Sequence, residues 1–173
     1  MILRPATPDD LETLRRWDRR PHVAANAGDD GGMDWARELP RSVPWRQMLM
    51  AEAGGRPMGI VIIIDPAREE TRYWGDVAPG LRAIDIWIGE ADRLGRGFGT
   101  AMMGMALERC FRVPEVTAVL VDPLHANTRG RRFYERLGFR PLERRTFGPD
   151  DCMVYRLDRA GWEAAAGACG KAP

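Results

Sequence analysis

Apolar residues recur with the period of an α-helix in some parts of the chain and with the alternation of a β-strand in others. Leu11, Leu14 and Trp17 recur at helical spacing, so we expect a helix there that Thr7 caps. Apolar runs on either side of Gly54-Gly55 are typical of a β-hairpin. The elements expected in the N-terminal half are a strand over residues 1–4, a helix over 7–19, a short helix over 35–39 and hairpin strands over 45–53 and 57–64.

The C-terminal half has a clearer alternation of strand and helix patterns after a polar loop over residues 65–80. The elements expected there are strands over 83–88 and 116–121, helices over 100–112 and 127–138, and hairpin strands over 139–146 and 152–157. This order predicts a mixed α/β layer structure around one central sheet. We expect a single domain over residues 1–160. Alanine and glycine dominate residues 161–173, which we expect to form a disordered tail.

Composition places the chain among ordinary globular proteins. It has 173 residues, of which 45% are hydrophobic and 29% charged, enough for one domain with a substantial core. No apolar run approaches the roughly 20 residues that span a bilayer, and residues 1–4 do not open a signal peptide, so we expect a cytoplasmic protein. The three cysteines lie far apart without metal-ligand spacing, which predicts reduced thiols and no metal site.

The net charge of +1 hides a local asymmetry. Residues 65–92 contain seven acidic residues against three arginines, whereas residues 129–145 contain seven arginines against two glutamates. One region therefore favours a cationic ligand and the other an anionic one, although each single charge is also explained by a solvated surface. The basic region lacks interleaved aromatic residues, which argues against nucleic-acid binding.

Three glycines occur within five residues between a predicted strand and a predicted helix, at Gly95, Gly97 and Gly99. Such a turn leaves backbone N–H groups free at the positive end of the helix dipole, where phosphate binds well. The alternative is a tight connection that binds nothing. A P-loop is excluded because the only lysine is Lys171. A dinucleotide fold is disfavoured because the glycines come past the middle of the chain.

A second motif lies downstream, where Asn127 can cap a helix that Gly138 ends. Phe133 and Leu137 lie four residues apart and bury one face of that helix. Tyr134, between them, is better explained as a packing residue than as a functional one when it is considered alone.

The Gly-Arg-Gly-Phe-Gly-Thr turn at 95–100, followed by Asn127, Tyr134 and Gly138-Phe139, resembles the paired cofactor motifs of the GNAT superfamily of N-acetyltransferases over about residues 3–157. The resemblance implies a mixed α/β fold, with a mostly antiparallel sheet of about six or seven strands and about four helices. It also implies acetyl-CoA as co-substrate, with its pyrophosphate on the backbone of the turn and Asn127 on the pantetheine arm. The residues that it assigns to acetyl-CoA are Trp87, Ile88, Leu94, Gly95, Arg96, Gly97, Phe98, Gly99, Thr100, Asn127 and Arg131.

Within this superfamily, residues 80–85 and 122–127 look like those of the aminoglycoside 6'-N-acetyltransferases and of the siderophore-acylating enzymes. The resemblance implies a small cationic amine as acceptor, either an aminoglycoside or a lysine-like siderophore precursor. It extends to Trp17 and Pro21-His22-Val23, which correspond to an N-terminal substrate region. The chain departs from the aminoglycoside enzymes at Ala25-Asn26-Ala27 and Ile62-Ile63-Ile64. A non-catalytic acetyl-CoA sensor is a further alternative, and we expect a monomer or a homodimer.

Acetyl transfer to an amine requires a group that accepts a proton and a group that returns one to the thiolate. Alternation places Asp85 and Trp87 on one face of their strand, and we expect Asp85 to hold the acceptor ammonium and remove its proton, directly or through water. The alternative for Asp85 is an edge-strand carboxylate facing water. Tyr134 is the expected general acid, and backbone N–H groups of residues 87–89 the expected oxyanion donors.

Other polar and aromatic residues complete the expected acceptor site. Asp122 follows a buried strand and would anchor a second ammonium or hydroxyl, unless it only shapes an Asp-Pro turn. Trp74 would stack on a sugar or an aliphatic amine, with an ordinary core tryptophan as the alternative. His22 would line the N-terminal side, with a structural turn residue as the alternative. We expect His125 to be solvated.

Overall fold

The chain folds around one twisted sheet, and the structure, a computed structural model, describes residues 1–28 and 32–169. The strands are β1 Ile2–Pro5, β2 Arg46–Ala53, β3 Arg56–Ile64, β4 Leu81–Ile88, β5 Ala118–Val121, β6 Arg140–Phe147 and β7 Asp150–Asp158. The α-helices among the described residues are α1 Leu11–Asp18, α2 Pro21–Ala24, α3 Trp35–Glu38, α4 Phe98–Phe111, α5 Thr128–Arg136 and α6 Arg159–Cys169. The 3-10 turns are Pro8–Asp10 and Ala91–Arg93.

The sheet has the order β1-β2-β3-β4-β5-β7-β6. All neighbouring strands are antiparallel except β4 and β5, which are parallel. The expected mixed, mostly antiparallel α/β sheet is therefore confirmed. In the parts of the chain that the structure describes, no helix is long and apolar enough to cross a membrane.

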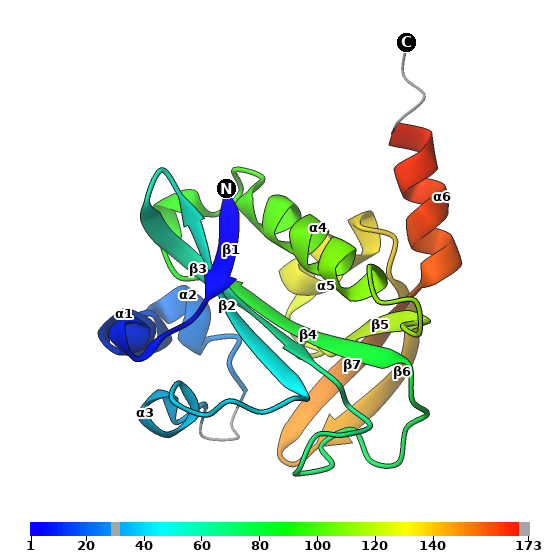
Figure 1. The fold of residues 1–173 in the computed structure, drawn as a ribbon, viewed down its shortest axis with the longest axis horizontal. Helices are drawn as coiled ribbons and strands as arrows, with labels where there is room; N and C mark the ends of the chain where they lie inside the picture. The colour runs from blue at the N-terminus through cyan, green and yellow to red at the C-terminus, as the bar shows by residue number, and fades with distance from the viewer. Residues whose placement is uncertain (29–31, 170–173) are drawn as a thin grey trace.

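Helices cover both faces of the sheet (Figure 1). Helix α4 packs over β3, β4 and β5, and its Met103 and Leu107 meet Val61, Ile63 and Ile84 in one core cluster. On the opposite face, Leu14 and Trp17 of α1 and Trp35 of α3 pack on Met50, Ile60 and Ile62. Because both faces are covered, the central strands are apolar nearly throughout, as the sequence pattern predicted.

Strand β4 is the exception, because it presents different chemistry to its two faces. Ile84, Ile86 and Ile88 pack toward α4, whereas Trp87 packs with the cluster of α1 and α3. Alternation then places Asp85 on the same face as Trp87, where the residue opposite it on β3 is Ile62. The predicted alternation along this strand is confirmed.

Strands β4 and β5 pair over a short length only. Their register joins Leu81–Ala83 to Ala118–Leu120, after which β4 continues to Ile88 and β5 ends at Val121. Beyond that point β5 provides no ladder partner for the backbone of β4. The two parallel strands are therefore unpaired at the end of the sheet where Asp85 lies, and we refer to this unpaired end as the opening between β4 and β5.

Two helices differ from the sequence expectation. Helix α2 starts at Pro21, a residue that suits the first position of a helix because its missing N–H is not needed there. Helix α6 occupies residues 159–169, where a disordered tail was expected. Its start is fastened to the body, because Trp162 stacks on Phe111 with ring centroids 6.0 Å apart and Arg159 donates to the carbonyls of Phe111 and Val116. Residues 170–173 of that expected tail lie outside the described residues.

Candidate active site

The glycine turn starts helix α4, as the sequence predicted, but the helix begins at Phe98, two residues earlier than expected. Gly95 and Gly97 have φ values of +73° and +82°, which L-residues with a side chain rarely adopt. Gly97 is the N-cap, and its carbonyl accepts a hydrogen bond of 3.0 Å from the N–H of Ala101. The N–H groups of the first turn have no partners within the helix and carry its positive dipole end, which suits a phosphate.

Helix α5 lies directly against this turn. A Cβ atom built on Gly95 would lie 4.0 Å from the guanidinium Nη2 of Arg129, and one built on Gly99 would lie 3.5 Å from the ring of Phe133. The turn thus combines free backbone donors with an exposed cation from a helix that begins at Thr128, far from Gly99 in the sequence. Arg129 was not among the predicted cofactor residues. The basic character of residues 129–145 was the sequence signal that pointed to it.

Asn127 caps α5, as predicted, and its Oδ1 accepts a hydrogen bond of 2.8 Å from the N–H of Gly130. Arg131 is engaged with the protein instead of the glycine turn. Its Nε donates to the hydroxyl of Tyr155 at 3.1 Å and its Nη1 to the carbonyl of His125 at 3.2 Å. The Tyr155 hydroxyl in turn donates to Glu135 at 2.8 Å. Arg131 therefore fastens α5 to β7 and to the loop before α5.

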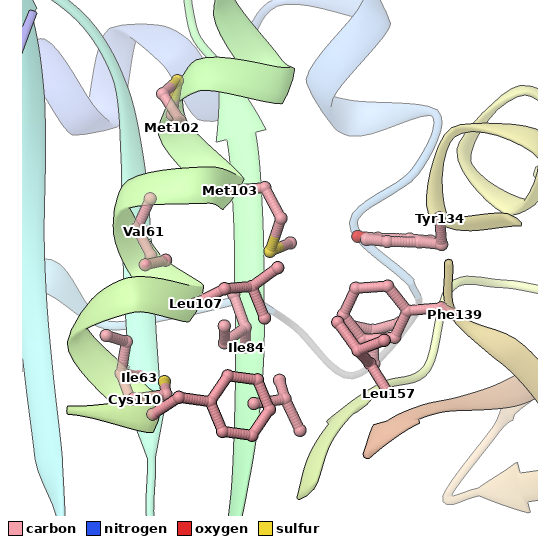
Figure 2. Packing of buried hydrophobic residues seen from close by; sticks show 14 of the residues in the cluster. Val61, Ile63, Ile84, Met102, Met103, Leu107, Cys110, Tyr134, Phe139 and Leu157 are labelled. Atoms are coloured by element: carbon pink, nitrogen blue, oxygen red, sulfur yellow. The ribbon is translucent and has the colours of Figure 1, made fainter. Parts of the chain in front are cut away.

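Tyr134 belongs to the same helix and is 8% exposed. Its ring packs on Phe139, and its hydroxyl points away from α5 toward Met103 of α4 (Figure 2). Burial raises the pKa of the Tyr134 phenol, and the carboxylates of Asp85 and Asp122 raise it further. The raised pKa keeps the Tyr134 phenol protonated at neutral pH.

Asp122 lies at the end of β5 and is held by an aromatic residue that the sequence analysis did not single out. The hydroxyl of Tyr73 donates to its Oδ2 at 2.8 Å, while the Tyr73 ring stacks on Phe147 at 4.4 Å. Burial raises the pKa of the Asp122 carboxyl to about 6, against the hydrogen bond from Tyr73. Trp74 does not offer its ring for stacking, because it is 4% exposed and packs edge-on against Phe147. The exposed aromatic side chain at this place is Tyr73.

A third carboxylate, Asp150, adds to the negative charge near Asp122. It begins β7, and a Cβ atom on Gly28 would overlap its carboxylate, so the backbone of Gly28 lies directly over it. The loop after Asp122 is fixed to the same strand, since the N–H of His125 donates to the Asp151 carbonyl at 2.7 Å. His125 is half-buried with its Nδ1 enclosed, and it is therefore less solvated than expected.

The end of β4 supplies backbone groups to the opening between β4 and β5. The N–H of Gly89 donates to the Met58 carbonyl at 2.8 Å, so the alternation of the antiparallel ladder turns the N–H and C=O of Ile88 the other way, toward the opening. The Ile88 carbonyl is 3.0 Å from His22 Nε2, which must carry the proton because a carbonyl only accepts. The Ile88 N–H points to where β5 has separated.

The side chains at this end of β4 do not all follow the prediction. The Trp87 indole packs on the α1 and α3 face of the sheet, opposite to α4. Only the backbone of Trp87 can therefore make the predicted contact with the cofactor. His22 contacts the backbone of β4 and thereby positions α2 against the site.

The family described as an acetyltransferase (GNAT) domain matches residues 6–147. The chain belongs to this family, which confirms the predicted resemblance, and it is an N-acetyltransferase.

Particular relatives share most of the chain. An aminoglycoside N(6')-acetyltransferase type 1 of Klebsiella pneumoniae is 30% identical over 165 residues, which cover 91% of this chain and 82% of the relative. A lysine N-acyltransferase MbtK of Mycobacterium tuberculosis is 28% identical over 79% of this chain and 67% of the relative. The crystal structure of aminoglycoside acetyltransferase AAC(6')-Ib with coenzyme A and kanamycin superposes with a TM-score of 0.85 and 27% identity, covering 95% of this chain and 98% of that one.

Proposed function

We propose that this enzyme transfers the acetyl group of acetyl-CoA to an amino group of an aminoglycoside, by direct attack within a ternary complex. The observation that carries the proposal is the glycine-capped start of α4, which lies against α5 and against Ile88, at the end of β4 that no longer pairs with β5. The similarity to AAC(6')-Ib, whose structure contains coenzyme A and kanamycin, supports both the acyl donor and the acceptor class.

The glycine turn and the opening form the proposed donor site. The pyrophosphate of acetyl-CoA would accept hydrogen bonds from the N–H groups at the start of α4, with Arg129 as a nearby cation. The pantetheine arm would enter between β4 and β5, past Asn127. The thioester would then lie between the Ile88 N–H and the Tyr134 hydroxyl.

Asp85 is the proposed proton acceptor. An alkyl ammonium has a pKa of about 10.4, so the acceptor amine arrives charged and must lose a proton before it attacks. The Asp85 carboxylate holds the ammonium on the α1 and α3 face of β4 and takes the proton, directly or through water. The negative charge of Asp122 and Asp150 attracts the other amines of a polycationic acceptor.

The remaining steps use the opposite side of the opening. When the neutral amine attacks the thioester carbonyl, the N–H of Ile88 stabilises the oxyanion. As the C–S bond breaks, the protonated Tyr134 gives its proton to the departing thiolate, and the attacking nitrogen, which is cationic after the attack, releases its second proton to water to give the neutral amide. The phenolate then regains a proton from solvent.

A lysine-like amine is the second candidate acceptor, favoured by the similarity to MbtK and by Ile62, an apolar residue opposite Asp85. The two candidates are separated by thiol release from acetyl-CoA with kanamycin, lysine and N-hydroxylysine at matched concentrations. The proposal predicts that kanamycin gives the highest kcat/KM. A higher kcat/KM with a lysine-like amine would contradict it.

Replacing Arg129 with glutamine should weaken coenzyme A binding about 5-fold, because one exposed cation near the phosphate site is lost. Calorimetric titration of coenzyme A gives the Kd directly. Arg136→Gln, at the exposed end of the same helix, is the matched control and should leave the Kd unchanged. Equal Kd values for the wild type and Arg129→Gln would remove Arg129 from the donor site.

The KM for a polycationic acceptor should fall as pH rises through about 6, because the Asp122 carboxyl is neutral below its raised pKa and anionic above it. The measurement is the KM for kanamycin between about pH 5 and 7, where alkyl amines stay protonated. In Asp122→Asn the KM should be high throughout this range and should lose the step. A wild-type KM that does not change across this range would contradict the role of Asp122.

A further inference from the structure

Three consecutive residues where β4 ends are each fastened to the N-terminal helices. His22 of α2 donates from Nε2 to the Ile88 carbonyl at 3.0 Å. A Cβ atom built on Gly89 would lie 1.9 Å from Cδ2 of Trp17, so the backbone passes against this indole only because residue 89 is glycine. The Nε1 of Trp17 donates to Oε1 of Glu90 at 2.8 Å. This segment therefore rests on α1 and α2.

The side chains that hold this segment are themselves fixed. Trp17 is fully buried and packs with Leu14 in the core cluster under β2 and β3. Arg16 and Arg20 pair with the Glu90 carboxylate at 3.2 and 3.6 Å. The hydrogen bond from Trp17, with the charges of these arginines, lowers the pKa of Glu90, which therefore stays ionised at neutral pH. The end of β4 cannot move away from α1 without breaking these contacts.

The hydrogen bond from His22 acts on the residue whose N–H is the proposed oxyanion donor. The N–H and C=O of one strand residue point to the same side, so Ile88 directs both to the opening between β4 and β5. Strand β5 ends at Val121 and does not extend to Ile88. His22 takes the place of a neighbouring strand at the Ile88 carbonyl and leaves the Ile88 N–H for the substrate.

The position of this N–H decides how well it works. An oxyanion donor must lie at hydrogen-bond distance from a charge that develops only in the transition state. A displacement of about 1 Å in such a site can cost about 100-fold in rate. Gly89 follows Ile88 directly and gives the backbone more freedom than another residue would, so contacts from outside the strand are needed to hold it.

We propose that His22 is a positioning residue for acetyl transfer, which holds the Ile88 N–H where the oxyanion forms. Trp17 holds the next two residues, by its contact with Gly89 and its hydrogen bond to Glu90. This inference rests on the proposed function, because it concerns the oxyanion donor of that reaction, but it does not depend on which amine is the acceptor. It predicts that loss of the His22 hydrogen bond lowers kcat equally for every acceptor and leaves each KM unchanged.

The test measures thiol release from acetyl-CoA by the full chain, with kanamycin, ribostamycin and lysine as acceptors. His22→Phe keeps an aromatic ring but loses the donor, and its kcat should fall about 10- to 100-fold with each acceptor that the wild type acetylates. The KM for each acceptor should stay unchanged, as should the Kd of coenzyme A, which lacks the acetyl carbonyl. His22→Gln keeps an N–H donor and should recover most of the kcat.

Asn26→Ala is the matched control. The Nδ2 of Asn26 donates to the carbonyl of His22 at 2.9 Å and so fastens the end of α2 to its own first turn. The control should lower the melting temperature and leave kcat at the wild-type value. Equal losses of kcat in His22→Phe and Asn26→Ala would mean that His22 only secures α2, which overturns the inference.

The remaining outcomes separate this inference from the proposed function. A His22→Phe enzyme with unchanged kcat and a higher KM for kanamycin would make His22 an acceptor-binding residue, and the inference would be wrong. It would also be wrong if His22→Gln were as slow as His22→Phe. If the wild type acetylates lysine but neither aminoglycoside, the proposed acceptor is wrong, and the kcat values with lysine still decide the role of His22. A wild type that acetylates none of the three refutes both.

Discussion

Replacing Tyr134 with phenylalanine is expected to lower kcat by about 100-fold or more, because the thiolate then leaves without its proton donor. The ring would remain packed against Phe139 and Tyr155, so the site should keep its shape. The raised pKa of the Tyr134 phenol means that the proton is present throughout the neutral range. Steady-state thiol release gives kcat, and the KM for acetyl-CoA should change little.

Tyr155→Phe is the matched control, because it removes another hydroxyl from the same cluster. That hydroxyl forms hydrogen bonds with Arg131 and Glu135. Its loss should therefore lower the melting temperature and have little effect on kcat. A Tyr134→Phe enzyme with the wild-type kcat would exclude Tyr134 as the general acid.

Asp85→Asn is expected to lower kcat/KM for the acceptor by about 100- to 1,000-fold, because the amide neither balances the ammonium nor accepts its proton. The loss should shrink as pH rises toward the pKa of the acceptor amine, since more of the amine is then neutral without help. A pH profile of kcat/KM for wild type and variant measures both effects.

Asp158→Asn provides the comparison for Asp85→Asn. This exposed carboxylate at the end of β7 pairs with Arg156 at 2.7 Å, and its replacement should leave kcat/KM at the wild-type value. If Asp85→Asn matches Asp158→Asn across the pH range, Asp85 has no part in proton removal.

The sequence predicted those parts of the site that depend on local pattern. The left-handed turn before α4 follows from Gly95 and Gly97, and the cap of α5 from Asn127. The face of Asp85 follows from strand alternation, because β4 has no bulge in its pairing with β3. The pairing of the two motifs predicted that α5 lies close to this turn, and Phe133 does lie against Gly99.

The parts that escaped prediction depend on packing between distant segments. Tyr73 and Trp74 are neighbours in a loop without periodicity, and only the position of Phe147 decides which ring is buried. Asp150 belongs to the site because its charge acts on Asp122, and no local pattern encodes the approach of these two distant segments. Helix α6 depends in the same way on Phe111, which receives Trp162.

The most direct test of the central claim is product analysis after incubation of the purified chain with acetyl-CoA and kanamycin. Mass spectrometry counts the acetyl groups added, and NMR identifies the amine that carries them. The proposed chemistry predicts one added acetyl group, on an amine, formed together with one free thiol and abolished by combining Tyr134→Phe with Asp85→Asn. Coenzyme A binding without acetylated kanamycin would contradict it.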